Sequence, residues 1–108
     1  MKARFNEIHE VAELDDLIEK SNNRPVILFK HSLTCPISTG VYNEISKADA
    51  VINLIVVQHA RNVSTAVAEK TGIRHESPQA LVIKDGEVVY HASHYDVTAS
   101  DVEKSLSL

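Results

Sequence analysis

The single cysteine of this chain, Cys35, is the residue with the most evident chemistry. It stands in the segment Lys30-His31-Ser32-Leu33-Thr34-Cys35-Pro36-Ile37-Ser38, after an apolar strand-like run and before a helix-like segment. A helix N-terminus presents unpaired backbone N–H groups and a partial positive charge, which favour a thiolate over a thiol. The position therefore predicts a reactive, nucleophilic sulfur.

A lone cysteine is more commonly a small buried hydrophobe. Here its neighbours Thr34 and Pro36 are not residues of a core strand, and Pro36 suits the first position of a helix. A reactive thiol is therefore the favoured interpretation. Ser38 stands where a second cysteine would make a dithiol, so the motif is able to attack a disulfide but not to resolve the resulting mixed disulfide. One cysteine also excludes an internal disulfide and a thiolate-rich zinc site.

Three polar neighbours are candidates for tuning the sulfur. Ser38 lies one helical turn after Cys35, and its hydroxyl either donates to the thiolate or is a solvated helix serine. Lys30 and His31 end the apolar run before the loop. They either add positive charge that favours the thiolate, or form a solvated loop edge.

The elements that position this segment alternate between strand-like and helix-like patterns. The predicted strands are residues 4–8, 26–29, 52–57, 79–83 and 87–91. Helices are expected across residues 11–18, from Pro36 to residue 45, across residues 63–70, and after Thr98, whose spacing to Asp101 resembles a capping box. Asn62 or Ser64 is the expected cap of the third helix, and Gly72 its stop.

The resulting order is β-α-β-α-β-α-β-β-α. Short βαβ crossovers require parallel pairing of the first strands, while Asp85-Gly86 between two apolar runs indicates an antiparallel hairpin at the end. A central mixed sheet flanked by helices in this order is the α/β arrangement of thioredoxin-like proteins. At 108 residues, the chain is expected to form one domain, 1–108.

Ser77-Pro78 precedes the fourth predicted strand. Proline cannot sit in a central strand ladder, so it marks a strand entrance, which in this topology faces Cys35. A cis peptide bond there, which this placement favours, turns the backbone of Ser77 outward to pair with an extended substrate segment. His75 and Glu76 are candidates for the rim of that substrate groove.

Composition narrows the partners and the compartment. The net charge is −4 and the basic residues are scattered, which disfavours nucleic acid. We find no apolar run of about 20 residues and no N-terminal signal core, so we expect no membrane and a cytoplasmic location. Six histidines invite a metal hypothesis, but they are dispersed: His91 and His94 should face opposite sides of an extended run, and the others lie in separate segments. We expect no metal site.

Two segments in this order carry a family resemblance. Residues Lys30-His31-Ser32 with Thr34-Cys35-Pro36-Ile37-Ser38, followed by His75-Glu76-Ser77-Pro78-Gln79, resemble the monothiol bacilliredoxins (bacilliredoxin C type) of the thioredoxin-like superfamily. The similarity extends along essentially the whole chain, including Val57-Gln58 and the Asp85-Gly86 hairpin.

The resemblance implies reduction of mixed disulfides between client proteins and bacillithiol, a small thiol that replaces glutathione in some bacteria. Cys35 is then the nucleophile, and bacillithiol is a co-substrate while no cofactor is bound. The groove for the thiol or client segment is then lined by Thr34, Pro36, His75, Glu76, Ser77 and Pro78.

Three functions remain open on the sequence. The first is a disulfide reductase of redox homeostasis, which removes bacillithiol in turnover. The second is a redox sensor or adaptor, in which Cys35 accepts bacillithiol under oxidative stress and the modified surface binds or releases a partner. The third is a thioredoxin-like binding module without catalysis.

Overall fold

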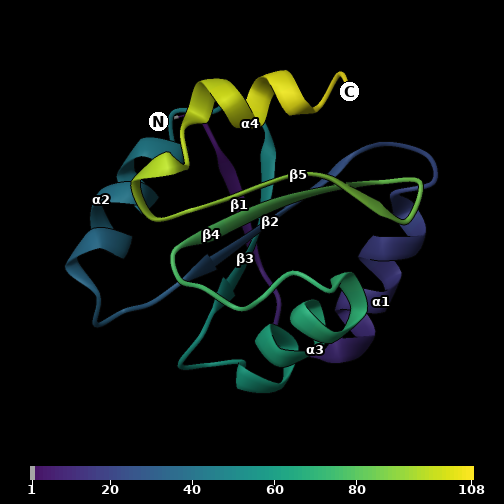
Figure 1. The fold of residues 1–108 in the computed structure, drawn as a ribbon, viewed down its shortest axis with the longest axis horizontal. Helices are drawn as coiled ribbons and strands as arrows, with labels where there is room; N and C mark the ends of the chain where they lie inside the picture. Colours follow the sequence, from purple (N-terminus) through teal and green to yellow (C-terminus); the bar gives the residue numbers. More distant parts are fainter. Residues whose placement is uncertain (1) are drawn as a thin grey trace.

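The computed structural model describes residues 2–108, which form one mixed five-stranded sheet in the order β1-β3-β2-β4-β5 with helices on both faces (Figure 1). The strands are β1 (Arg4–Glu7), β2 (Val26–His31), β3 (Val51–Val56), β4 (Gln79–Lys84) and β5 (Glu87–Ser93). The helices are α1 (Val11–Lys20), α2 (Pro36–Ile45), α3 (Arg61–Thr71), α4 (Ala99–Ser105) and a short 3-10 helix, η1 (His94–Asp96). Apart from η1, the elements and their order are those predicted.

Strand directions follow from the connections. β1 and β2 both pair in parallel with β3, because helices α1 and α2 return the chain to the same edge of the sheet. β4 pairs antiparallel with β2 on one side and with β5 on the other. The predicted Asp85-Gly86 turn joins β4 to β5, with positive φ at both residues. The thioredoxin-like mixed sheet is thus confirmed.

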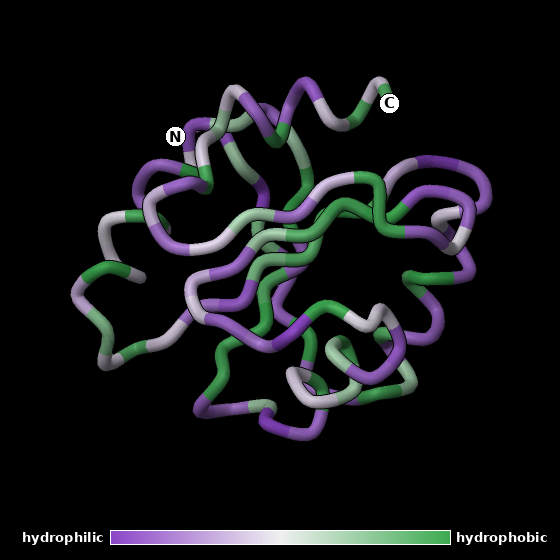
Figure 2. Tube along the Cα trace, in the orientation of Figure 1, coloured by the Kyte–Doolittle hydropathy of each residue, from purple (hydrophilic) through white to green (hydrophobic). Residues whose placement is uncertain are grey.

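The sheet has one hydrophobic core on each face, and β2 contributes alternate side chains to the two cores. Ile27 and Phe29 pack beneath α2 and α4, while Leu28 packs on the opposite face beneath α1 and α3. Apolar segments accordingly cross the middle of the molecule, and hydrophilic segments occur mainly in the helices and turns around them (Figure 2). A strand that is buried on both faces lacks polar alternation, as residues 26–29 do.

Most of the predicted helix ends are also present. Pro36 is the first residue of α2, the Thr98 hydroxyl accepts a hydrogen bond from the Asp101 amide at 3.1 Å, and Gly72 ends α3 with φ 73°. The predicted cap of α3 is wrong, because Asn62 and Ser64 lie inside the helix. Ala60 is the N-cap residue, and no side chain caps the helix. The prediction failed because a polar residue in the first turn of a helix looks the same in the sequence as a polar cap residue.

Substituting two glycines should separate helix propensity from backbone strain. Gly40 lies inside α2 with open space around the position of a Cβ, so Gly40→Ala should raise the free energy of unfolding by about 0.5–1 kcal/mol. Gly72 has φ +73°, so Gly72→Ala should lower it by roughly 1–2 kcal/mol. Urea denaturation of the two variants measures both effects, and shifts of the same sign would contradict this account.

Candidate active site around Cys35

Cys35 is the N-cap residue of α2. Its backbone is extended, with φ −102° and ψ 116°, and its carbonyl oxygen accepts the first helical hydrogen bond, from the Thr39 amide at 3.2 Å. The thiol is free and half-buried. Since the first amides of a helix have no helical acceptor, the sulfur sits at the positive end of α2. This is the location expected from the sequence.

Gln58 holds the loop between β2 and Cys35, a role that was not predicted. Its side-chain oxygen accepts from the Leu33 amide at 3.1 Å, and its Nε2 donates to the Ser32 hydroxyl at 2.9 Å. β3 lies parallel to β2, so the residues that follow both strands meet at one edge of the sheet. A polar residue two positions after the end of β3 is therefore the signal that would have found Gln58.

Ser38 is placed differently from both expectations. Its side chain is fully buried rather than solvated. Its hydroxyl oxygen lies 2.8 Å from His31 Nδ1 and accepts from the Ser32 amide at 3.0 Å. Among the hydrogen bonds of residues 2–108, none joins Ser38 to the sulfur of Cys35. The hydroxyl of the first helical turn points back to the end of β2, where it ties the helix to the strand.

His31 is part of this support rather than a nearby positive charge. Its ring lies 5.0 Å from the ring of Tyr42 and 6.2 Å from that of Phe29, between centroids. Burial lowers the pKa of His31 below its usual value, so the ring is mainly neutral at neutral pH. The expectation that His31 favours the thiolate by its charge is therefore wrong under these conditions.

Lys30 points away from α2, to the opposite face of the sheet. Its side chain has 0% exposure, and its Nζ donates to the Ser64 carbonyl oxygen at 3.0 Å and lies 3.1 Å from His75 Nδ1. Burial lowers the pKa of Lys30 to about 8. The prediction that Lys30 tunes the thiolate is wrong because β2 extends through His31, and consecutive side chains of a strand face opposite sides.

The predicted cis peptide bond at Ser77-Pro78 is present. Lys30 pairs with Gln79 in the antiparallel ladder of β2 and β4. Pro78 therefore lies beside the end of β2, next to the loop that carries Cys35. The Pro78 carbonyl oxygen accepts from the His94 amide at 2.9 Å. The Ser77 backbone, by contrast, has no hydrogen-bond partner among the described residues, and its buried Oγ has none either.

The other predicted groove residues lie around these two loops. Thr34, Pro36 and His75 are exposed, Glu76 and Ser77 are half-buried, and Pro78 is buried. The Glu76 carboxylate accepts from the Ser93 hydroxyl at 3.3 Å and lies 3.6 Å from His94 Nδ1. Gln79, buried in β4, donates through Nε2 to the Arg74 carbonyl oxygen at 3.0 Å and so holds the loop that carries His75 and Glu76.

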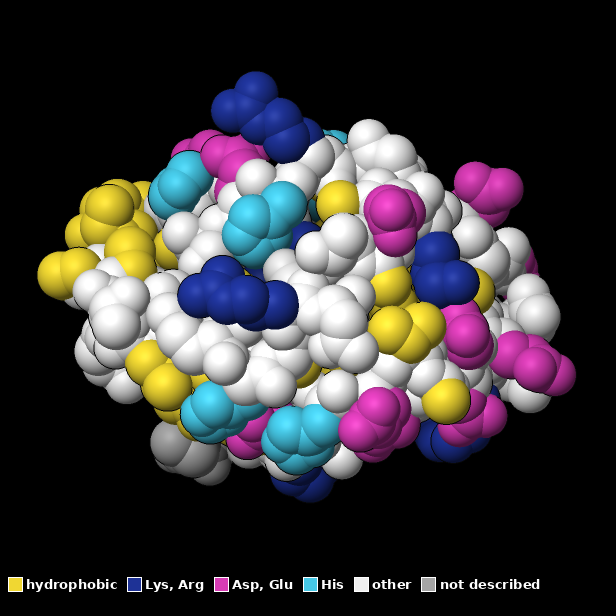
Figure 3. Space-filling view, turned by 90° about the horizontal axis from the view of Figure 1, so that it is seen from below, with side chains coloured by type: hydrophobic (Ala, Val, Ile, Leu, Met, Phe, Trp, Pro, Cys, Tyr) yellow, Lys and Arg dark blue, Asp and Glu magenta, His cyan; other side chains and the backbone are white. Residues whose placement is uncertain are grey.

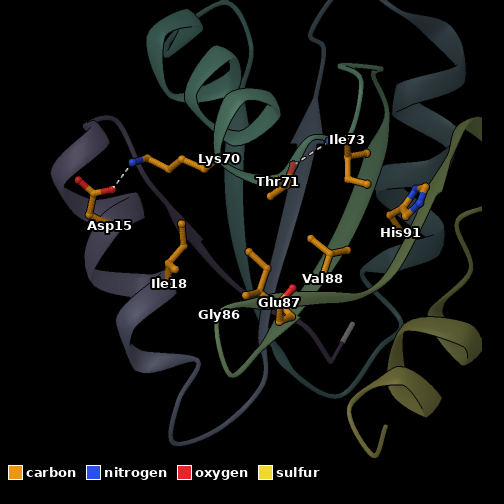
Figure 4. Close-up of a pocket in the computed structure, with 10 residues that line it drawn as sticks. Asp15, Ile18, Lys70, Thr71, Ile73, Gly86, Glu87, Val88 and His91 are labelled. Atoms are coloured by element: carbon orange, nitrogen blue, oxygen red, sulfur yellow. Dashed lines mark hydrogen bonds and ion pairs between the residues drawn. The ribbon is translucent and has the colours of Figure 1, made fainter.

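A pocket of about 540 Å³ lies elsewhere, between α1, the end of α3 and the β4–β5 hairpin (Figure 4). An ion pair of 2.8 Å between Lys70 and Asp15 spans one side of it. None of the predicted site residues lines this pocket, so the chemistry of Cys35 does not belong to it. Within residues 2–108, no group of three His, Cys, Asp or Glu side chains is arranged to hold a metal ion, and no helix is long and apolar enough to cross a membrane.

Comparison with known proteins agrees with this geometry. The family model for the monothiol bacilliredoxin BrxC matches residues 6–102. The chain belongs to this family. A solved structure described as a candidate oxidoreductase with a thioredoxin fold is 32% identical, with a TM-score of 0.85 over 94% of this chain and 92% of the other.

Thioredoxins share the fold at much lower identity. A mutant thioredoxin from Halobacterium salinarum NRC-1 is 18% identical, with a TM-score of 0.72 over 96% of this chain and 88% of its own. Thioredoxin from Trypanosoma brucei brucei is 7% identical, with a TM-score of 0.75 over 99% and 91%. Membership of the bacilliredoxin family and the thioredoxin fold together support a thiol oxidoreductase role.

Removing the Ser38 hydroxyl tests whether this bacilliredoxin uses it as a structural tie. Ser38→Ala leaves the buried amide of Ser32 without its acceptor, so the free energy of unfolding should fall by about 1–3 kcal/mol. The exposed neighbour Thr39 is the matched control, and Thr39→Ala should stay within about 0.5 kcal/mol of the unmodified protein. Urea denaturation measures both, and equal effects would contradict the assignment.

Buried Lys30 should make stability depend on pH. Its pKa is about 8 in the folded protein against 10.5 ordinarily, so between these two values the unfolded chain binds more protons and the free energy of unfolding rises with pH. Lys30→Met removes this contribution. From pH 8 to 10.5, the unmodified protein should therefore gain roughly 3 kcal/mol relative to the variant. Denaturation series at several pH values measure the difference, and parallel curves would exclude a depressed pKa of Lys30.

Proposed function

We propose that this chain is a monothiol disulfide reductase that removes bacillithiol from client proteins, with Cys35 as the nucleophile. The observation that carries the proposal is the position of Cys35 at the N-cap of α2, beside the loop of the cis peptide bond Ser77-Pro78. Family membership supports the choice of bacillithiol as the thiol.

In the first step, the Cys35 thiolate attacks the bacillithiol sulfur of a client mixed disulfide. A disulfide bond forms between Cys35 and bacillithiol, the bond between bacillithiol and the client breaks, and the client cysteine leaves as a thiolate that takes up a proton. The helical amides that follow Pro36 stabilise the negative charge on the Cys35 sulfur before the attack.

The Ser77 backbone is a docking edge for the substrate. Its N–H and C=O have no partner among the described residues, and they precede β4, whose other residues pair with β2 and β5. An extended substrate segment is able to pair with these groups by strand addition. Thr34 and Pro36 lie on the cysteine side of such a segment, and His75 and Glu76 on the side of the Pro78 loop.

The second step needs an external thiol. Cys35 is the sole cysteine of the sequence, and the position of a resolving cysteine is occupied by Ser38, which is bonded to His31 and Ser32. A second bacillithiol thiolate therefore attacks the bacillithiol sulfur on Cys35, which releases oxidised bacillithiol and regenerates the thiolate. Without an intramolecular thiol, the intermediate persists until this molecule arrives. A reducing compartment such as the cytoplasm fits this scheme.

Turnover distinguishes a reductase from a sensor. With a bacillithiol-modified model client and excess bacillithiol, we expect many client molecules to be reduced per protein molecule, and mass spectrometry should show one bacillithiol adduct on the intermediate. Cys35→Ala should abolish both turnover and adduct, because no other thiol is present. Thr39→Ala, which changes an exposed residue of the same helix, should retain both.

Two other results would reject the proposal. Modification of Cys35 that stops after one equivalent would leave the redox sensor as the function. Absence of any adduct would leave only a binding module.

A further inference from the structure

Lys30 is a buried cation without an anionic partner. Its Nζ contacts the Ser64 carbonyl oxygen at 3.0 Å and His75 Nδ1 at 3.1 Å, both of which are uncharged acceptors. None of the ion pairs among the described residues includes it. Buried lysines are rare unless paired, because the interior disfavours their charge. The folding of β2 alone does not account for a lysine here.

The contact with Lys30 determines which nitrogen of His75 carries the proton. An ammonium group has only donors, so His75 Nδ1 has to be the acceptor, and a neutral ring then carries its hydrogen on Nε2. The Ser64 hydroxyl lies 3.1 Å from the same Nδ1 and also has a hydrogen to donate. Burial and the positive charges of Lys30 and Arg61 lower the pKa of His75, which keeps the ring neutral at neutral pH, while Glu76 acts weakly in the other direction.

His75 is well placed to present that hydrogen to a ligand. It is exposed and precedes the cis peptide bond by two residues, in the loop that Gln79 holds through the Arg74 carbonyl. On the face of the molecule formed by α3 and its flanking loops, histidine side chains lie beside both basic and acidic side chains (Figure 3). The nearby acid Glu76 is already paired with Ser93 and His94.

We propose that Lys30 is a positioning residue that fixes His75 as an Nε2–H donor, and that this donor binds a carboxylate of the small thiol that clears Cys35. The proposal rests on the function proposed above, because it assigns a second contact to the same co-substrate. A carboxylate is favoured over a neutral carbonyl because the Lys30 ammonium group lies 3.1 Å from the ring and has no anionic partner among the described residues. Lys30 acts through His75 and does not itself touch the ligand, since its side chain is fully buried.

NMR of the protein without substrate tests the first part of the proposal, that Lys30 fixes His75 as an Nε2–H donor. The ring-nitrogen shifts of His75 should show the Nε2–H form in the unmodified protein and a mixture of both neutral forms in Lys30→Met, a variant that fills the same space without a donor. His9, exposed before α1, should keep its shifts in both proteins. An Nδ1–H form of His75 in the unmodified protein would overturn the proposal, whatever the activity.

Kinetics of the second step test the ligand. Protein loaded with bacillithiol on Cys35 is mixed with bacillithiol, cysteine or cysteine methyl ester, and loss of the adduct is followed by mass spectrometry. His75→Ala should slow clearance by cysteine and bacillithiol roughly tenfold, the value of one hydrogen bond to a charged group. Lys30→Met should also slow clearance by cysteine and by bacillithiol. Clearance by the ester should change less than about twofold, and His9→Ala should change none of the rates.

The possible failures have different meanings. Equal slowing of cysteine and its ester would show that His75 does not bind the carboxylate. If only the first step slowed, the attack on the client, then the group that accepts the hydrogen bond from His75 would belong to the client. This result would also overturn the proposal. Failure of every thiol to clear Cys35 in the unmodified protein would reject the proposed function instead, and with it the ligand, while the NMR result would still report on Lys30 and His75.

Discussion

The alternation of two consecutive side chains at the end of β2 is the constraint on which the site depends. His31 points toward α2 and contacts Ser38 in the first turn, whereas Lys30 points toward α3 and contacts His75. One strand end therefore holds both the helix that carries Cys35 and the loop that carries the cis proline. Because β2 is central and pairs with β3 and β4, its end cannot move without disturbing two ladders.

The residue that makes the site monothiol, Ser38, also connects α2 to the end of β2. In a dithiol motif, the residue three positions after the nucleophile would be a second cysteine. Here that residue is Ser38, which is fully buried and bonded to the Ser32 amide and to His31. The position is thus part of the connection between strand and helix. Its hydroxyl oxygen accepts a hydrogen bond from the loop, which gives residue 38 a structural role that is independent of redox chemistry.

The sequence predicted the elements better than the directions of side chains. Periodicity placed the strands and helices, and Pro36, Thr98 and Gly72 marked three helix ends, because each is a local steric or hydrogen-bonding requirement. The errors at Lys30 and His31 have different causes. Lys30 faces away from α2 because β2 continues through His31 and consecutive side chains of a strand face opposite sides. His31 faces α2, but burial keeps its ring neutral at neutral pH. The contacts of Ser38 and Gln58 depend on tertiary packing, which no local pattern encodes.

A buried lysine in β2 is the feature that folding explains least. Methionine would occupy similar space and avoid the desolvation that lowers the pKa of Lys30 to about 8. The charge is nevertheless still mostly present at neutral pH, since that value lies above it. Its contacts are to Ser64 and to His75, beside the loop of Pro78, and not to any carboxylate among the described residues. An interaction that destabilises the fold and orients an exposed ring in the loop that leads to the cis proline is more readily explained by binding than by stability, which is why we place the second contact of the thiol at His75.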